Sequence, residues 1–230
     1  MAKENQFSRY FFNSESILDA LPAKDRTLFE GHLRLKRIPK GRTLFEEGGR
    51  PRTVFILKRG RVKIFQRSPD GAEQIVYIYS SGEMFGYRPL LSSNLHPATA
   101  TTIEECGIYF LSDRAFLELL DRSSALSNLL LKNLSHEFTV LVNRIANFSQ
   151  RSAKERIALA LLIVNETYRK AGASIPEIGL SRADLAAFAG TTGETLARIL
   201  TRFKGEKIIR TKGRKLFILR TDKLKDLIEQ

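Results

Sequence analysis

The sequence of 230 residues predicts an α+β protein in which two domains are joined by a long helix. Short alternating apolar runs separated by turn residues fill residues 38–111, and an apolar stripe at helical spacing follows in 124–149. The last third predicts two short helices around a glycine, and then a hairpin. Because a chain of this length holds about two cores, we expect domains at 1–122 and 150–230, with the connecting helix at 123–149.

The N-terminal part is expected to begin as helix and then to change to short strands. Residues 14–37 predict a helical segment that is interrupted at Pro22. The strands are expected at residues 42–45, 53–57, 61–65 and 74–78, with turns at 48–49, 60, 69–71 and 82. Many short strands at this spacing predict a small antiparallel barrel or sandwich, and the pattern becomes helical again near Arg114.

The helix expected at 124–149 has a narrow apolar seam. Its members alternate at spacings of three and four residues, which is the a/d pattern of a heptad: Leu131, Leu134, Phe138, Leu141, Ile145 and Phe148. Such a stripe often packs on the core of its own domain. A seam this long between two domains favours instead a helix that pairs with a second copy of the chain.

Residues 180–209 predict a helix-turn-helix. Ser181 begins a short helix with Asp184 as a capping-box partner, and Ala186 is small where two helices approach closely. Gly190 stands at a sharp turn that needs a positive φ, and Thr192 can cap the second helix. The spacing is typical of a DNA-binding helix-turn-helix, although any two-helix corner could share it.

The second helix has one apolar and one polar face. The apolar face holds Leu196, Ile199, Leu200 and Phe203, and the other face holds Glu194, Ala197, Arg198 and Thr201. Two short strands at 208–211 and 216–219 follow around Gly213 and predict a wing. Seven cations accompany the single acid Glu206 in this stretch: Arg202, Lys204, Lys207, Arg210, Lys212, Arg214 and Lys215. A basic cluster beside a helix-turn-helix favours phosphate contacts over a merely solvated surface.

The charge of the whole chain points to an anionic partner. The formal net charge is +13 and the pI is near 10.0. Residues 151–230 hold 17 Lys and Arg against 9 Asp and Glu, whereas residues 1–150 hold 21 against 16, so the C-terminal third is the more basic per residue. Nucleic acid is the expected partner, and an acidic membrane surface is the weaker alternative.

Targeting signals and cysteine content favour the cytoplasm. No apolar run is long enough to cross a bilayer, and the first residues lack the apolar core and cleavage site of a signal peptide. Cys106 is the single cysteine, which excludes an internal disulfide and any metal site made of cysteines only. We expect a cytoplasmic protein with no membrane partner.

The order of these parts resembles the catabolite activator/FNR (Crp/Fnr) family of bacterial transcription regulators over roughly residues 15–220. The motifs that resemble the family lie at residues 39–41, 44–48, 57–63, 82–86 and 193–198. The resemblance implies a cyclic-nucleotide-binding-type antiparallel β-roll, a long dimerisation helix and a winged helix-turn-helix domain. It implies a homodimeric, sequence-specific DNA-binding regulator and not an enzyme, with duplex DNA, a second copy of the chain and RNA polymerase as partners.

Glu194 and Arg198 are the residues expected to read bases. They lie one turn apart near the N-terminus of the second helix, where Arg can donate to guanine O6 and N7 and a carboxylate can accept from cytosine N4. The alternative is a surface ion pair between the two. The resemblance implies a palindromic site with TGA-type half-sites. Further contacts are expected from Thr192, Gly193, Thr195, Ala197, Thr201, Arg202, Lys212 and Arg214.

The expected effector pocket departs from the cyclic-AMP-binding members of the family. In those members an acid binds the ribose of the nucleotide, and an Arg-Ser pair binds its phosphate. Here Tyr87 stands at the position of the acid and is followed by Arg88, and Pro97 and Ala98 stand at the positions of the Arg-Ser pair. Because a buried phosphate needs a charge partner, we expect an effector other than cyclic AMP, or none. The pocket is expected at Gly82, Glu83, Phe85, Gly86, Tyr87, Arg88, His96, Pro97 and Ala98.

Three alternatives can be weighed from the residues. A four-cysteine iron–sulfur cluster of the FNR type is excluded by the single cysteine. A haem-based gas or redox sensor would need an axial ligand, and His32, His96 and His136 are the only histidines. A metal oxygenase needs clustered His and carboxylate ligands, which these positions do not form in the sequence. We expect no cofactor, and a haem sensor and a cyclic-AMP-responsive regulator stay as the alternative functions.

Overall fold

The computed structural model describes residues 16–169 and 175–229, without the side chains of residues 147 and 148. The chain divides into two compact units. One holds the described residues up to Gln66 together with Val76–Val142, and the other holds Arg67–Ile75 together with the described residues from Asn143 onwards. The helix α5 (Ser124–Gln150) begins in the first unit and ends in the second.

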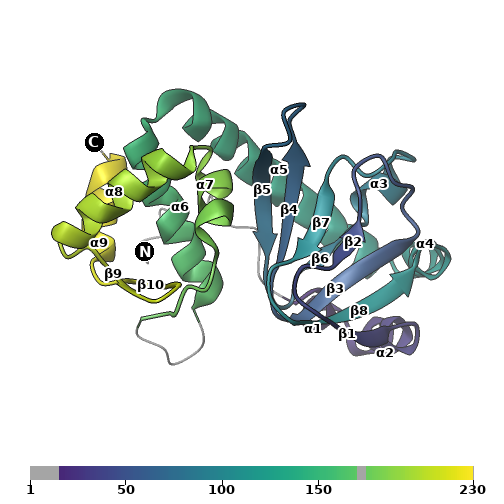
Figure 1. Ribbon diagram of the computed structural model, residues 1–230. Helices are drawn as coiled ribbons and strands as arrows, with labels where there is room; N and C mark the ends of the chain where they lie inside the picture. The colour runs from purple at the N-terminus through teal and green to yellow at the C-terminus, as the bar shows by residue number, and fades with distance from the viewer. Residues whose placement is uncertain (1–15, 170–174, 230) are drawn as a thin grey trace. The chain divides into compact units, whose positions relative to one another are not determined.

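The first unit contains two four-stranded sheets with the strand orders β1-β8-β3-β6 and β2-β7-β4-β5 (Figure 1). The strands are β1 (Arg34–Ile38), β2 (Thr43–Phe45), β3 (Thr53–Arg59), β4 (Val62–Arg67), β5 (Glu73–Tyr79), β6 (Met84–Phe85), β7 (Thr99–Thr102) and β8 (Cys106–Ser112). β8 pairs antiparallel with both β1 and β3, and β7 pairs antiparallel with both β2 and β4. The short runs predicted a small antiparallel barrel or sandwich, and the family resemblance implied a β-roll; the two antiparallel sheets confirm this fold class.

One local prediction is wrong. The segment expected to be helical through residue 37 ends its helix earlier, with α1 (Ile17–Ala20) and α2 (Ala23–Gly31) followed by β1. Leu35 pairs with Tyr109 and Lys36 with Ile108, so a partner strand some seventy residues away decides the conformation. The helix break at Pro22 is confirmed, since this residue is the N-cap of α2.

Strand β3 separates two apolar clusters, because successive side chains of a strand point to opposite faces. Val54 and Ile56 pack with α1, α2 and α4 (Asp113–Arg122), while Phe55 and Leu57 pack between the sheets with Val62, Tyr77, Tyr79 and Phe85. Val54 and Leu57 are completely buried. Each such aliphatic side chain contributes about 1.5–3 kcal/mol through the water that it excludes.

Only part of the predicted seam of α5 packs on the core of the unit, where Leu134 and Leu141 contact the two apolar clusters. Leu126, Leu130 and Val140 are buried apolar residues of this helix in the same clusters. The predicted seam residues Leu131, Phe138 and Ile145 are 65%, 69% and 69% exposed, and Leu134 and Leu141 are half-buried. Phe148 has a side chain outside the described part of the chain. Packing on its own domain therefore does not account for the exposed part of the stripe.

The second unit is a winged helix-turn-helix, as predicted. It consists of α6 (Ala153–Tyr168), α7 (Arg182–Ala189), α8 (Gly193–Gly205), β9 (Ile209–Lys212), β10 (Lys215–Ile218) and α9 (Thr221–Glu229). The helix α6 is buried over most of its length and begins at a capping box between Ser152 and Glu155. It packs against α7, α8 and α9, so it forms the centre on which the helix-turn-helix rests.

Candidate nucleic-acid interface and effector pocket

The turn between α7 and α8 has the geometry expected from its residues. Ser181 Oγ accepts from Asp184 N at 3.0 Å and begins α7. Gly190 ends this helix at φ 60° and ψ 50°, a left-handed conformation that favours glycine. Thr192 Oγ1 accepts from Thr195 N at 3.2 Å and begins α8. The predicted apolar face of α8 is buried, at Leu196, Ile199, Leu200 and Phe203.

The polar face of α8 is open to solvent. Glu194, Ala197, Arg198 and Thr201 are exposed, as are the adjoining Thr192, Gly193 and Arg202, and Thr195 is half-buried. No ion pair joins Glu194 to Arg198 in the described structure. Arg202, in contrast, donates to Glu206 at 2.7 Å. Glu194 and Arg198 therefore leave an acceptor and a donor group available side by side for an external partner.

The cations of the wing fall into two groups. Arg210 lies over the Phe217 ring at 4.8 Å from its centroid, and Lys215 pairs with Glu177 at 2.6 Å. Lys212 and Arg214 instead flank Gly213 at the hairpin tip, where the pairing of residues 212 and 215 leaves a two-residue loop. Gly213 has φ 57° there. The exposed tip of the wing therefore presents the two predicted phosphate-binding cations.

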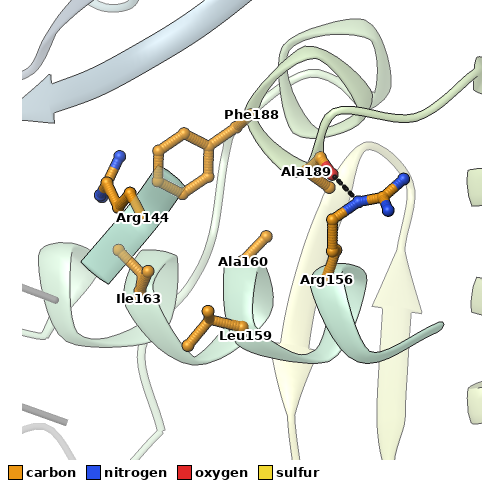
Figure 2. A pocket seen from close by; sticks show the side chains of 7 residues that line it. All are labelled: Arg144, Arg156, Leu159, Ala160, Ile163, Phe188 and Ala189. Atoms are coloured by element: carbon orange, nitrogen blue, oxygen red, sulfur yellow. Dashed lines mark hydrogen bonds between the residues drawn. The ribbon is translucent and has the colours of Figure 1, made fainter. Parts of the chain in front are cut away.

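Arg156 is a residue of this interface that the sequence did not single out. From α6 its guanidinium donates to the carbonyl oxygen of Ala189 at 3.2 Å (Figure 2). It also donates to the carbonyl oxygens of Gly190 and Arg151, both at 2.9 Å. These bonds fix the end of α7 and the turn before α8. The available signal was a basic residue at the start of an otherwise apolar helix, which by itself does not specify a carbonyl partner.

A pocket of about 340 Å³, with its open mouth included, lies behind the helix-turn-helix. Leu159, Ala160 and Ile163 of α6 line it together with Phe188 of α7. Arg144, from the end of α5, places its guanidinium over the Phe188 ring at 4.9 Å from the centroid (Figure 2). Arg144 is buried, so this contact links the end of the long helix to α7.

The β-roll holds a second pocket of about 380 Å³, again with its open mouth included. Its walls are Phe45, Ile64, Tyr79, Gly86, Tyr87, Arg88, Pro89, His96, Pro97 and Ala98. Of the expected pocket residues, Gly86, Tyr87, Arg88, His96, Pro97 and Ala98 line it. Gly82, Glu83 and Phe85 do not line it: Phe85 belongs to the core between the sheets, and Gly82 forms a turn at φ 95°.

Comparison with known proteins finds a matching family model for each of the two units. A family model described as "Cyclic nucleotide-binding domain" matches residues 35–123, and one described as "Crp-like helix-turn-helix domain" matches residues 155–227. The fumarate and nitrate reduction regulatory protein of Vibrio cholerae serotype O1 is 27% identical over 196 residues, which cover 84% of this chain and 78% of that protein. The chain belongs to the Crp/Fnr family of transcription regulators. It is a DNA-binding regulator and not an enzyme.

Solved structures share the fold of this Crp/Fnr protein. FixK2 from Bradyrhizobium japonicum aligns with a TM-score of 0.76 at 20% identity, over 85% of this chain and 96% of that one. The c-di-GMP-responsive regulator CLP from Xanthomonas campestris aligns with a TM-score of 0.68 at 20% identity, over 86% and 99%. No helix among residues 16–169 and 175–229 is long and apolar enough to span a membrane.

Tyr87, at the position where cyclic-AMP-binding family members have an acid, and the following Arg88 both bind Glu137 in this chain. Arg88 Nε donates to Glu137 Oε2 at 2.7 Å, and Arg88 Nη2 contacts the same oxygen. Tyr87 OH donates to Glu137 at 3.2 Å. Glu137 lies on α5 and is 7% exposed. Burial raises the pKa of Glu137, while the neighbouring Arg88 opposes that shift.

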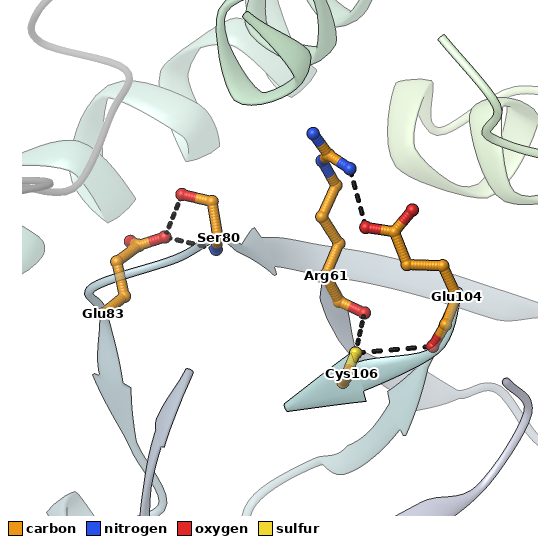
Figure 3. A network of polar contacts seen from close by, with 5 residues as sticks. All are labelled: Arg61, Ser80, Glu83, Glu104 and Cys106. Atoms are coloured by element: carbon orange, nitrogen blue, oxygen red, sulfur yellow. Dashed lines mark hydrogen bonds and ion pairs between the residues drawn. The ribbon is translucent and has the colours of Figure 1, made fainter. Parts of the chain in front are cut away.

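Glu83 forms a separate network at the turn before β6. It accepts from Tyr77 OH at 2.7 Å. It also accepts from Ser80 Oγ at 2.8 Å and from Ser80 N at 2.5 Å (Figure 3). Burial raises its pKa to about 7, and these hydrogen bonds oppose the shift. Glu83 therefore holds the turn together from within.

Among the described residues, the histidines and the cysteine do not cluster into a metal site. Across the part of the chain that is described, no three His, Cys, Asp or Glu residues are placed to hold a metal ion. His96 is buried in the β-roll pocket and stacks on Phe45 at 3.8 Å between ring centroids, and burial lowers its pKa. Cys106 is buried beside the carbonyls of Arg61 and Glu104 (Figure 3), and burial raises the pKa of its thiol to about 11. Cys106 therefore packs as a small buried residue.

Proposed function

We propose that this Crp/Fnr regulator acts in the cytoplasm as a homodimer that reads a palindromic DNA site with α8. The observation behind the proposal is the arrangement of Glu194 and Arg198 on an exposed helix face, one turn apart and joined by no ion pair in the described structure. Together they offer a carboxylate acceptor for cytosine and a two-bond donor for guanine. TGA-type half-sites suit this pair, and RNA polymerase is the further partner that we propose.

The exposed seam of α5 supports the proposed dimer. Leu131, Phe138 and Ile145 of α5 are mostly exposed. Burial against the same helix of a second copy stabilises the pair by about 1.5–3 kcal/mol for each large apolar side chain. Two-fold pairing would also supply two copies of α8 for two half-sites about one helical turn of DNA apart.

The experiment that tests this function is selection of bound duplexes from a randomised DNA pool, without an effector and then with an extract of small metabolites. We expect a palindromic motif. Arg198→Ala should relax one base position in each half-site at a loss of about 1–3 kcal/mol. Arg220→Ala is the matched control, because Arg220 is not among the expected DNA contacts and is already paired with Asp222. Binding by the native protein that is independent of sequence under both conditions would overturn the proposal.

The β-roll is proposed to sense a small molecule other than cyclic AMP. Tyr87 replaces the ribose-binding acid of the family, and Pro97 and Ala98 replace its phosphate-binding pair. Among the described residues of the pocket wall, Arg88 is the one cation, and it is paired with Glu137. Because the residues that hold the ribose and the phosphate in cyclic-AMP-binding members are replaced, calorimetry with cyclic AMP should show no binding. Cyclic di-GMP is the second ligand to test, since the Xanthomonas regulator is described as responsive to it.

The alternative of a haem sensor rests on His96, which lies in the wall of the pocket. The two proposals differ in the absorption spectrum of the purified protein. A Soret band that disappears in His96→Ala would replace the small-molecule proposal by the haem sensor, whereas we expect no such band. Binding of cyclic AMP that raises DNA affinity would favour the other alternative, a cyclic-AMP-responsive regulator.

A further inference from the structure

The walls of the β-roll pocket combine flat apolar surfaces with one positive charge. Phe45 and His96 of the wall stack with their ring planes 11° apart, and Tyr79 of the wall is backed by the core residue Phe85 at 23°. Among the described residues of the wall, Arg88 is the one with a permanent cation. Burial lowers the pKa of His96, which disfavours a second positive charge on this wall.

The charge of Arg88 is balanced from inside the protein. Glu137 reaches it from α5 and accepts from two nitrogens of its guanidinium, and Tyr87 also donates to Glu137. The Arg88 side chain remains 37% exposed, whereas that of Glu137 is 10% exposed. Arg88 is thus accessible from the pocket while its counter-ion lies on the buried side.

We infer that the pocket takes a small flat monoanion of the aromatic carboxylate class, which binds Arg88 in place of Glu137. This inference rests on the sensing role proposed above for the β-roll. A carboxylate matches the forked donors of a single guanidinium, whereas a doubly charged phosphate would meet one cation only. A flat ring suits walls made of stacked aromatic side chains.

The exchange would couple the pocket to the helix proposed to form the dimer. A buried carboxylate that loses its cation is strongly destabilised, so Glu137 must gain a proton or move toward water. Phe138, the next residue, is the most exposed part of the seam together with Ile145. A shift of this turn of α5 therefore changes the surface offered to a second copy.

Calorimetry on the full-length protein tests the inference, with benzoate, benzamide, inorganic phosphate and cyclic AMP as probes. Benzoate should bind, while benzamide, which has the same shape without the charge, and phosphate should not. Arg88→Gln should weaken benzoate binding at least about tenfold, and Glu137→Gln should tighten it by about tenfold because the internal competitor is removed. The opposite signs of these two changes are the signature of exchange at Arg88.

A matched control is Glu104→Gln. Glu104 is also a carboxylate of the β-roll paired with an arginine, Arg61 at 2.6 Å, but neither residue lines the pocket. This variant should leave benzoate affinity unchanged. Thermal unfolding checks that each variant is folded, and Glu137→Ala, which should also tighten binding, serves as a second test if Glu137→Gln is unfolded.

Three results would overturn the inference: no benzoate binding, equal binding of benzoate and benzamide, or benzoate binding that Glu137→Gln leaves unchanged or weakens. None of these results bears on the proposed DNA recognition, because the DNA selection and Arg198→Ala test the other unit. A selected palindrome without benzoate binding would reject this inference alone. Sequence-independent DNA binding with benzoate binding intact would reject the proposed function and leave the pocket chemistry standing.

Discussion

The recognition helix and the β-roll pocket each contain an arginine and a glutamate, but the two pairs are in opposite states. Glu194 and Arg198 lie in water on α8 with no ion pair between them in the described structure. Arg88 and Glu137 are joined, and the acid is buried. An exposed charge is stabilised by water until a partner replaces it, whereas a buried charge needs its counter-ion inside the fold. The first pair is therefore available for an external ligand, and the second must be separated before a ligand can use it.

The largest effect is expected when the buried pair is broken on one side only. Arg88→Met leaves Glu137 without its cation and should lower the free energy of unfolding by about 3 kcal/mol. We place it at the low end of the usual range because the Arg88 side chain is 37% exposed. The double variant with Glu137→Leu should recover most of the loss in denaturant unfolding. A double variant as unstable as Arg88→Met would mean that the pair does not act as a pair.

The buried acid without a cation, Glu83, should make stability depend on pH. Its pKa rises from 4.5 to about 7 on folding, so the folded state holds a proton that the unfolded state releases. Stability from this group is present at low pH and is lost as the pH rises from 4.5 towards and beyond about 7. Over this window the native protein should lose about 2–3 kcal/mol more than Glu83→Gln in urea unfolding. Equal pH profiles for the two proteins would contradict the prediction.

Substitution of Arg156 tests a cation whose hydrogen bonds go to backbone carbonyls within the DNA-binding unit. Arg156→Met removes the donors to Ala189 and Gly190 and should lower stability by about 2 kcal/mol. Binding to the selected DNA should weaken at all base positions alike, because the turn before α8 loosens while Glu194 and Arg198 remain. Loss of selectivity at one position only would show that Arg156 itself reads a base.

The smallest effect is expected at the wing tip, where the charge is exposed. Arg214→Ala should leave stability within about 0.5 kcal/mol of the native value and reduce the slope of log affinity against log salt by about one. Arg210→Ala is the matched comparison, because this cation lies on Phe217. It should lower stability by about 0.5–1 kcal/mol and change the salt slope less. Equal salt slopes for the two variants would remove the distinction between bonded and available cations.

Much of the DNA-binding unit could be predicted because its determinants are local. The caps at Ser181 and Thr192 and the left-handed Gly190 are encoded within a few residues of where they act, and all three have the expected geometry. The apolar face of α8 follows from its 3.6-residue period. The pairing of Arg156 with distant carbonyl groups, in contrast, has no local pattern.

The β-roll was less predictable because its contacts join distant segments. Residues near the end of the first helical segment became strand β1 once β8 was available as a partner. The expected pocket contained the segments that do line it, since the family resemblance aligns their backbone. It also contained Glu83 and Phe85, whose side chains lie inside the turn network and the core.

The sequence by itself determined the order of the parts and the faces of the helices, because periodicity and capping are properties of neighbouring residues. The choice of Glu194 and Arg198 as the residues that read bases rests on the family resemblance and stays a prediction. Only the tertiary structure decided which charges are available. It placed Glu137 of α5 on Arg88 of the β-roll, 49 positions apart in the chain, and formed no ion pair between Glu194 and Arg198 in the described structure. The physical reason is that a buried charge is stable only with a counter-ion inside the fold, which a distant segment can supply. An exposed charge is stabilised by water and needs no counter-ion.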